Sequence, residues 1–164
     1  LFPDYNESLW IDANIDILKP YIFNKIENTD KNLLIPIHYC RNCVYKELNV
    51  VKFLKKEDDE KLNLALQLLK ENQMPENYGL NETNIIYRKH NDSNVIKIME
   101  EWWNIIKDYS KRDQLSLSYV LWKNNINLEE ISIDNARLDL INYKMYSHNP
   151  ASSLTGKLLS LLLP

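Results

Sequence analysis

The chain has 164 residues, of which 45% are apolar and 26% charged, the proportions of an ordinary globular domain with its own core. Its net charge of −3 gives no electrostatic reason to expect a nucleic-acid partner, since proteins of that class usually carry a basic surface. With only two glycines, the sequence also excludes the common glycine-rich phosphate-binding loops.

The ends of the chain raise further expectations. Because the first residue is Leu1 rather than Met, we expect a processed or partial product, and the acidic Asp4 and Glu7 argue against a signal peptide. No apolar run is long enough to cross a bilayer. Leucines at helical spacing in residues 154–163 favour a short helix that packs on the domain or on a partner. Contact of this tail with a membrane surface is the alternative.

In chain order, hydrophobic periodicity predicts strands that alternate with helices, which is typical of an α/β domain. After a first strand at 8–11, a helical turn and a loop fill residues 20–32. Pro36 lies inside the second strand and indicates an edge strand or a bend. Ser93 is the expected cap of a long helix. The later strands are expected at 33–37, 84–88 and 126–133, the other helices at 44–55, 60–71 and 113–122, and a loop at 74–79.

An aspartate and an asparagine follow the first predicted strand. In W-I-D-A-N, Asp12 and Asn14 stand two residues apart, at the end of a strand where open α/β sheets bind ligands. Their oxygens suit Mg²⁺ or Mn²⁺, and such an ion can also hold a diphosphate. The alternative is a simple turn, because Asp and Asn commonly end strands.

The second predicted strand leads into a polar helix start. His38 and Arg41 stand there in a position to contact a phosphate or carboxylate, and a capping network is the alternative. Cys40 and Cys43 form a C-x-x-C pair, which alone is a weak sign of zinc binding or redox chemistry. A zinc site needs a second pair of ligands, and the chain has only three histidines. We therefore expect two reduced cysteines without a metal.

A third polar group surrounds the strand predicted at 84–88. Gly79 allows a tight backbone turn close to a ligand. Glu82 is a candidate general base or acceptor-binding carboxylate. Arg88 and His90 stand at the end of this strand.

A fourth group precedes the last predicted helix. Arg112, Asp113 and Gln114 follow one another there, and Asp113 could serve only as an N-cap. Trp102 and Trp103 are adjacent, so they cannot both point inward. We expect one in the core and the other at the edge of a cleft.

Taken in order, these groups resemble the glycosyltransferase family catalogued as domain of unknown function 616, the TOD/MUCI-type glycosyltransferase-like domain. The resemblance covers about residues 1–133. It rests on W-I-D-A-N, H-x-x-R-x-C-x-Y-x-E, M-P-x-x-x-G-L-x-E-T-N-I-I-x-R-K-H, W-W and S-x-R-D-Q-L-S-x-x-Y-V-L-W.

The resemblance implies an incomplete GT-A-like (Rossmann-like) mixed sheet flanked by helices. Residues 1–133 would be the C-terminal portion of a catalytic domain whose nucleotide-binding half is largely missing, and residues 134–164 a C-terminal extension. Such enzymes transfer a sugar from a nucleotide-sugar donor to a glycan or other hydroxyl acceptor. They work in the cytoplasm if bacterial, or in the Golgi lumen if eukaryotic. A non-catalytic carbohydrate-binding or scaffold domain that retains the fold is the alternative.

The resemblance also implies roles for single residues. Asp12 and Asn14 fall on the D-x-D motif that holds Mn²⁺ or Mg²⁺, although Asn14 departs from its acidic pair. Asp113 and Glu82 would be the catalytic carboxylates. Donor or acceptor binding would fall to His38, Arg41, Gly79, Arg88, His90, Arg112 and Gln114.

Overall fold

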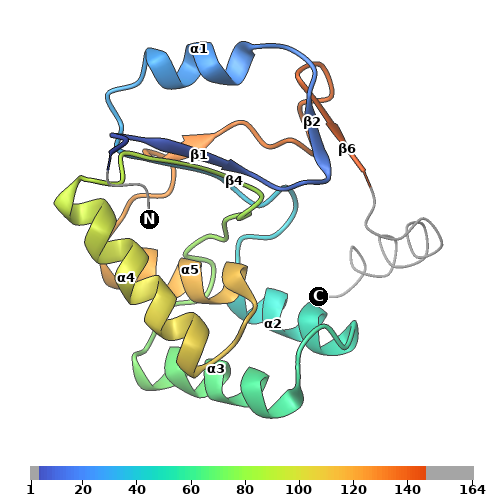
Figure 1. Ribbon diagram of the computed structural model, residues 1–164. Helices are drawn as coiled ribbons and strands as arrows, with labels where there is room; N and C mark the ends of the chain where they lie inside the picture. The colour runs from blue at the N-terminus through green and yellow to red at the C-terminus, as the bar shows by residue number, and fades with distance from the viewer. Residues whose placement is uncertain (1–3, 147–164) are drawn as a thin grey trace.

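The computed structural model describes residues 4–146, which form a mixed α/β fold (Figure 1). Its elements are β1 (Ser8–Ile11), β2 (Ile15–Ile17), α1 (Tyr21–Glu27), β3 (Leu33–Pro36), α2 (Val44–Phe53), α3 (Asp59–Glu71), β4 (Ile85–Arg88), α4 (Ser93–Asp108), α5 (Asp113–Lys123), β5 (Ser132–Ile133) and β6 (Tyr143–Met145). The predicted α/β class is confirmed, and the mixed sheet flanked by helices is consistent with an incomplete Rossmann-like fold.

The main sheet has the strand order β1-β4-β3-β5. Strand β4 runs antiparallel to β1 and β3, whereas β3 and β5 run parallel. The carboxyl ends of β1, β3 and β5 therefore meet the start of β4 at one edge of the sheet. We call this the carboxyl edge, and it is where open α/β sheets bind ligands.

Alternation along the strands gives the sheet two buried faces (Figure 1). Leu33, Ile35 and Ile86 belong to the larger core, which helices α2 to α5 cover. Leu34 and Tyr87 belong to the smaller core on the opposite face, which α1 and the β2–β6 pair cover. Both faces are apolar, so the polar residues that the sheet carries are confined to its edges and ends.

Pro36 does not mark an edge strand, so that expectation is wrong. Strand β3 has β4 on one side and β5 on the other. Proline is tolerated because it is the last residue of the strand and offers its carbonyl there. That carbonyl accepts a hydrogen bond from the backbone N–H of Glu82 at 2.9 Å.

Two local expectations also differ from the structure. The strand expected at 126–133 pairs only at Ser132–Ile133, because the side chain of Asn127 caps a turn by accepting from the N–H of Glu129. Helix α4 is capped by Asp92 rather than Ser93. The Asp92 carboxylate accepts from the N–H groups of Asn94 and Val95, both at 3.0 Å.

The chain continues the same fold beyond residue 133, where the sequence analysis placed a boundary. Strand β6 pairs with β2, and Ala136 and Tyr143 are buried in the smaller core. The leucine-rich segment 154–163 lies outside the described residues. Within residues 4–146, no helix is long and apolar enough to span a membrane.

Replacing Tyr143 tests whether this last segment belongs to the domain. Its ring is buried in the smaller core, and its hydroxyl has no hydrogen-bond partner among the described residues. We expect Tyr143→Ala to lower the free energy of unfolding by about 3–5 kcal/mol. Tyr143→Phe should leave it unchanged or raise it by up to about 1 kcal/mol, because no hydrogen bond is lost. Denaturant titration measures both, and a neutral Tyr143→Ala variant would show that β6 is dispensable.

Candidate functional site

Four consecutive polar residues lie buried at the carboxyl edge, directly before β4. Asn81, Glu82, Thr83 and Asn84 are 0%, 1%, 8% and 5% exposed. Burying polar groups costs free energy unless they are hydrogen-bonded. The partners of this polar segment (residues 81–84) therefore define the site.

Glu82 is the charged member of the polar segment. Its carboxylate accepts from Nε of Arg137 at 3.0 and 3.1 Å and from the amide of Asn84 at 2.8 Å. Burial raises the pKa of Glu82 above its ordinary value, and the Arg137 guanidinium opposes that rise. Glu82 is thus held in place inside the protein, out of reach of solvent.

His38 follows β3 and faces Glu82, with 4.0 Å between its Nε2 and the carboxylate. Its Nδ1 accepts from the backbone N–H groups of Cys40 and Arg41. Burial, followed by the charges of Arg41 and Arg137, lowers the pKa of His38 to about 3. The imidazole is therefore neutral at physiological pH. Its other ring nitrogen, Nε2, lies 3.2 Å from Nη2 of Arg41.

Arg41 ties the same region to the start of α2. Its Nε donates to Glu47, in the first turn of that helix, at 2.6 Å, and the Glu47 side chain is buried. The structure has Cys40 and Cys43 as free thiols, the first exposed and the second buried. The absence of metal at this pair remains a prediction.

Asp113 joins the polar segment from the start of α5. One of its oxygens accepts from the hydroxyl of Thr83 at 2.6 Å, and the other from the backbone N–H of Gln114. Arg112, rather than Asp113, is the N-cap residue. Asp113 is partly exposed and accepts from neutral donors only, so its charge is available to a ligand.

Arg112 adds positive charge directly before Asp113, and Lys56 lies close enough to Arg112 to feel its charge. Neither forms an ion pair with any residue of the described range 4–146, and Nε of Arg112 is buried without a hydrogen-bond partner there. Burial lowers the pKa of Lys56, and the charge of Arg112 lowers it further. The carboxylate of Glu47 opposes this fall in pKa, so Lys56 has an acidic neighbour as well as cationic ones.

The tryptophan pair separates as expected. Trp102 packs against the larger core, and its indole donates to Ser116 at 2.9 Å and to the carbonyl of Asp113 at 3.3 Å. Trp103 is 59% exposed and lines a groove between β1 and α4.

Asp12 reaches the polar segment through its backbone. Its N–H donates to the carbonyl of Asn84 at 2.9 Å, and one carboxylate oxygen accepts from the indole of Trp10. Asn14 makes a different contact. Its side-chain amide donates to the backbone carbonyl of Tyr146, and the backbone N–H of Tyr146 donates to the carbonyl of Asn14. Within residues 4–146, no three His, Cys, Asp or Glu side chains group as metal ligands.

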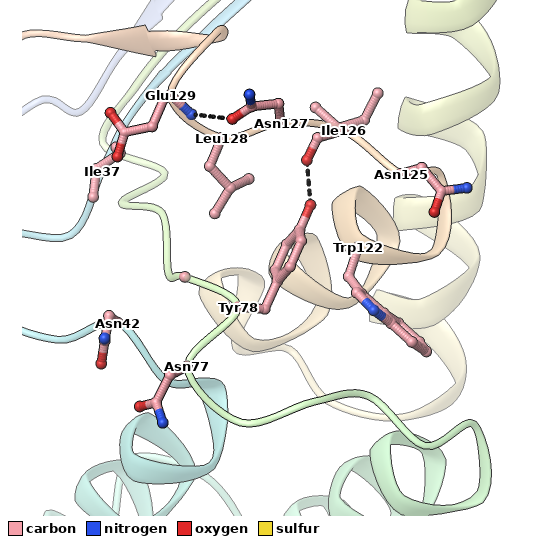
Figure 2. Close-up of a pocket in the computed structure, with 11 residues that line it drawn as sticks. Ile37, Asn42, Asn77, Tyr78, Trp122, Asn125, Ile126, Asn127, Leu128 and Glu129 are labelled. Carbon is pink, nitrogen blue, oxygen red and sulfur yellow. Dashed lines mark hydrogen bonds between the residues drawn. The ribbon is translucent and has the colours of Figure 1, made fainter.

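Besides Asn14, three of the predicted site residues lie away from the polar segment's contacts. Gly79 lines a pocket of about 670 Å³ between two loops (Figure 2). Arg88 and His90 line the groove of about 510 Å³ beside Trp103, at the far end of β4. The carboxyl edge therefore gathers His38, Arg41, Glu82, Asp113 and the backbone of Asp12.

Sequence reasoning missed Arg137, the main partner of Glu82. It was assigned to an extension, although Asp134 and Asn135 follow a strand just as Asp12 does. The Asn135 amide donates to the carbonyl of Ile37, and its oxygen accepts from the N–H of Arg137. Polar residues directly after a strand, at 134–135 as at Asp12, are the sequence signal that could have identified the region of Arg137.

Comparison with known proteins gives one match. A family model described as TOD1/MUCI70, glycosyltransferase-like domain, matches residues 1–142. No curated protein and no solved structure matches the chain.

The lowered pKa of His38 predicts a pH dependence of stability. Unfolded His38 takes up a proton near pH 6.5, whereas folded His38 does so only near pH 3. The folded state is therefore destabilised as pH falls, by up to about 2 kcal/mol between pH 7 and 5. In His38→Asn, the side-chain oxygen can accept the same two backbone N–H groups but cannot titrate. Denaturant titrations at pH 5, 6 and 7 should show a smaller loss in the variant, and equal losses would contradict this.

Gly79 should not tolerate a side chain. Its φ is +130°, and a Cβ would lie 2.3 Å from Cδ1 of Leu128. We expect Gly79→Ala to lower the free energy of unfolding by about 1–3 kcal/mol or more. The loss should shrink but persist in a Leu128→Ala background, because removing the clash leaves the backbone strain. A double-mutant cycle measures this, and strictly additive losses would show that the two residues do not collide.

Proposed function

This chain belongs to the family of TOD1/MUCI70 glycosyltransferase-like domains, and on that premise we propose that it transfers a sugar from a nucleotide-sugar donor to an acceptor hydroxyl. The observation that carries the proposal is a cation without an ion pair among residues 4–146, Arg112, directly before the partly exposed carboxylate of Asp113. The cation suits a donor diphosphate, and the carboxylate suits an acceptor hydroxyl.

The diphosphate fits the cationic side of this arrangement. Arg112 immediately precedes α5, a helix of 11 residues whose N-terminal N–H groups and dipole also favour an anion. A cation that no carboxylate neutralises can offset the charge that develops on the leaving phosphate. That stabilisation grows toward the transition state, so it speeds the reaction rather than merely tightening binding.

Asp113 is the residue that we assign to the acceptor. It is partly exposed, and Thr83 and the N–H of Gln114 orient both of its oxygens. It can therefore anchor the attacking hydroxyl or take its proton. Glu82, at 1% exposure, cannot touch an acceptor, so we assign it a positioning role through Arg137 and His38.

A divalent cation, Mn²⁺ or Mg²⁺, would take Asp12 as its protein ligand. Mg²⁺ is commonly held by one or two carboxylates together with substrate phosphates and water, and Asp12 is a partly buried carboxylate at the carboxyl edge. Asn14 fits such an ion less well, since its amide nitrogen is engaged with Tyr146 and its oxygen is buried. When bound, the ion would act as a Lewis acid on the diphosphate.

The test is nucleotide release by the full chain from a panel of nucleotide sugars. We expect Arg112→Gln to lower kcat/KM by at least about tenfold, which is about 1.4 kcal/mol of transition-state stabilisation. Lys111→Gln is the matched control, because it removes one positive charge from an exposed neighbour. Equal losses in both variants would mean that general charge, not a phosphate contact at Arg112, controls turnover.

Asp12→Ala tests the metal separately. With Mn²⁺ present, it should lower kcat while leaving the melting temperature within a few degrees of the parent. A chelator should lower turnover of the parent but not lower turnover of Asp12→Ala further. Chelator-insensitive transfer would remove the metal role. No nucleotide release from any donor, together with saccharide binding, would favour a non-catalytic carbohydrate-binding domain instead.

A further inference from the structure

The pocket beside Gly79 has the lining of a saccharide site. It has a volume of about 670 Å³, inside the usual range for small-molecule sites. The aromatic side chains of Tyr78 and Trp122 come from the loop before β4 and from the end of α5 (Figure 2). The hydroxyl of Tyr78 donates to the carbonyl of Ile126, which fixes its ring. Fixed aromatic rings offer a sugar a flat apolar surface.

Unengaged amides complete the lining. Asn42, Asn77 and Asn125 are exposed, and their side chains form no hydrogen bond with another described residue. A carboxamide both donates and accepts hydrogen bonds, as a sugar hydroxyl does. Three such groups around an aromatic surface therefore suit a ligand that carries many hydroxyls.

The charge of the lining narrows the class of ligand. Glu129 is its one ionisable acid, and none of its residues is Lys, Arg or His. A phosphate or carboxylate would find no cation here and would meet a negative charge. Arg112, which we assign to the donor, is not among the lining residues. The pocket thus suits a neutral ligand.

The pocket shares its walls with the candidate site. Ile37 lines it and directly precedes His38. The N–H of Gly79 donates to the carbonyl of Asn42 at 2.9 Å, which joins its two wall loops. These loops continue into Arg41 on one side and into the polar segment on the other. A ligand in the pocket therefore contacts the loops that continue into His38, Arg41 and the polar segment.

We propose that this pocket is the acceptor subsite and that it takes a neutral saccharide, an inference that rests on the proposed function. Tyr78 and Trp122 provide the stacking surface, and the amides of Asn42, Asn77 and Asn125 bind hydroxyls. Glu129 disfavours uronic acids and phosphorylated sugars.

Backbone conformation offers a competing explanation for two of the asparagines. Asn77 and Asn125 have φ of 58° and 55°, the left-handed region that Asn tolerates better than most residues. Their replacement by Gly separates the two explanations, because Gly keeps this conformation and removes only the amide. Gln73, with φ of 57° and no place in the pocket, is the matched control.

The experiment titrates neutral hexose di- and trisaccharides into the full chain by calorimetry, with pyrophosphate and a uronic-acid disaccharide as anionic probes. We expect a neutral saccharide to bind, and Asn77→Gly/Asn125→Gly to weaken it about tenfold or more. Gln73→Gly should leave the affinity unchanged, and all variants should keep the parent melting temperature. Glu129→Gln should improve binding of the uronic-acid probe.

Three results would overturn the subsite: no neutral saccharide binding, binding that ignores both asparagines, or displacement of the saccharide by pyrophosphate. Donor hydrolysis in water, measured on the same proteins, separates this inference from the proposed function. If the donor is hydrolysed but saccharide affinity is unchanged in Asn77→Gly/Asn125→Gly, the subsite proposal is wrong and the transferase proposal is supported. If binding requires them while no donor is hydrolysed, the subsite stands as a binding site and the transferase fails.

Discussion

The buried charge of Glu82 is the constraint on which the carboxyl edge depends. A carboxylate at 1% exposure cannot remain ionised without a cation, and Arg137 provides it through contacts at 3.0 and 3.1 Å. Removing one partner of such a pair commonly costs about 3–5 kcal/mol, because the other charge stays buried. The pair therefore fixes the loop after β5 against the segment before β4, and His38 and Asp113 take their positions from that junction.

This arrangement separates two chemical environments on one small domain. At the carboxyl edge, Arg41 pairs with Glu47 and Arg137 pairs with Glu82, and a neutral histidine lies among them. The pocket around Tyr78 is lined by amides and aromatic rings with a single carboxylate. In the proposed transferase, the charged edge would suit the donor diphosphate and the pocket would suit a neutral acceptor. The two surfaces differ in charge and share loops, so each could select its own ligand.

Sequence alone predicted the parts of this fold that have strong local signals. Helices α2 to α5 and strands β1, β3 and β4 follow apolar periodicity, and polar residues after a strand, before a strand and before a helix pointed to His38, Glu82 and Asp113. Strands β2 and β6 were missed because three-residue strands carry little pattern, and only pairing between distant segments creates them. Arg137 could not be assigned by motif, since its role follows from a buried carboxylate 55 residues earlier in the chain.

The clasp between Asn14 and Tyr146 joins residues that are 132 positions apart, and Lys25 pairs with Asp134 across 109 positions. Contacts of such long range slow folding, because closing the long loop between the two residues lowers the entropy of the chain before the contact stabilises it. On the ribosome, α1 and β2 must wait for nearly the whole described chain to emerge before the smaller core can close. Until β6 emerges, the apolar face of Leu34, Ile85 and Tyr87 lacks the cover that Tyr143 provides. A nascent chain that ends before β6 would therefore expose part of this sheet face, which is the kind of surface that chaperones bind.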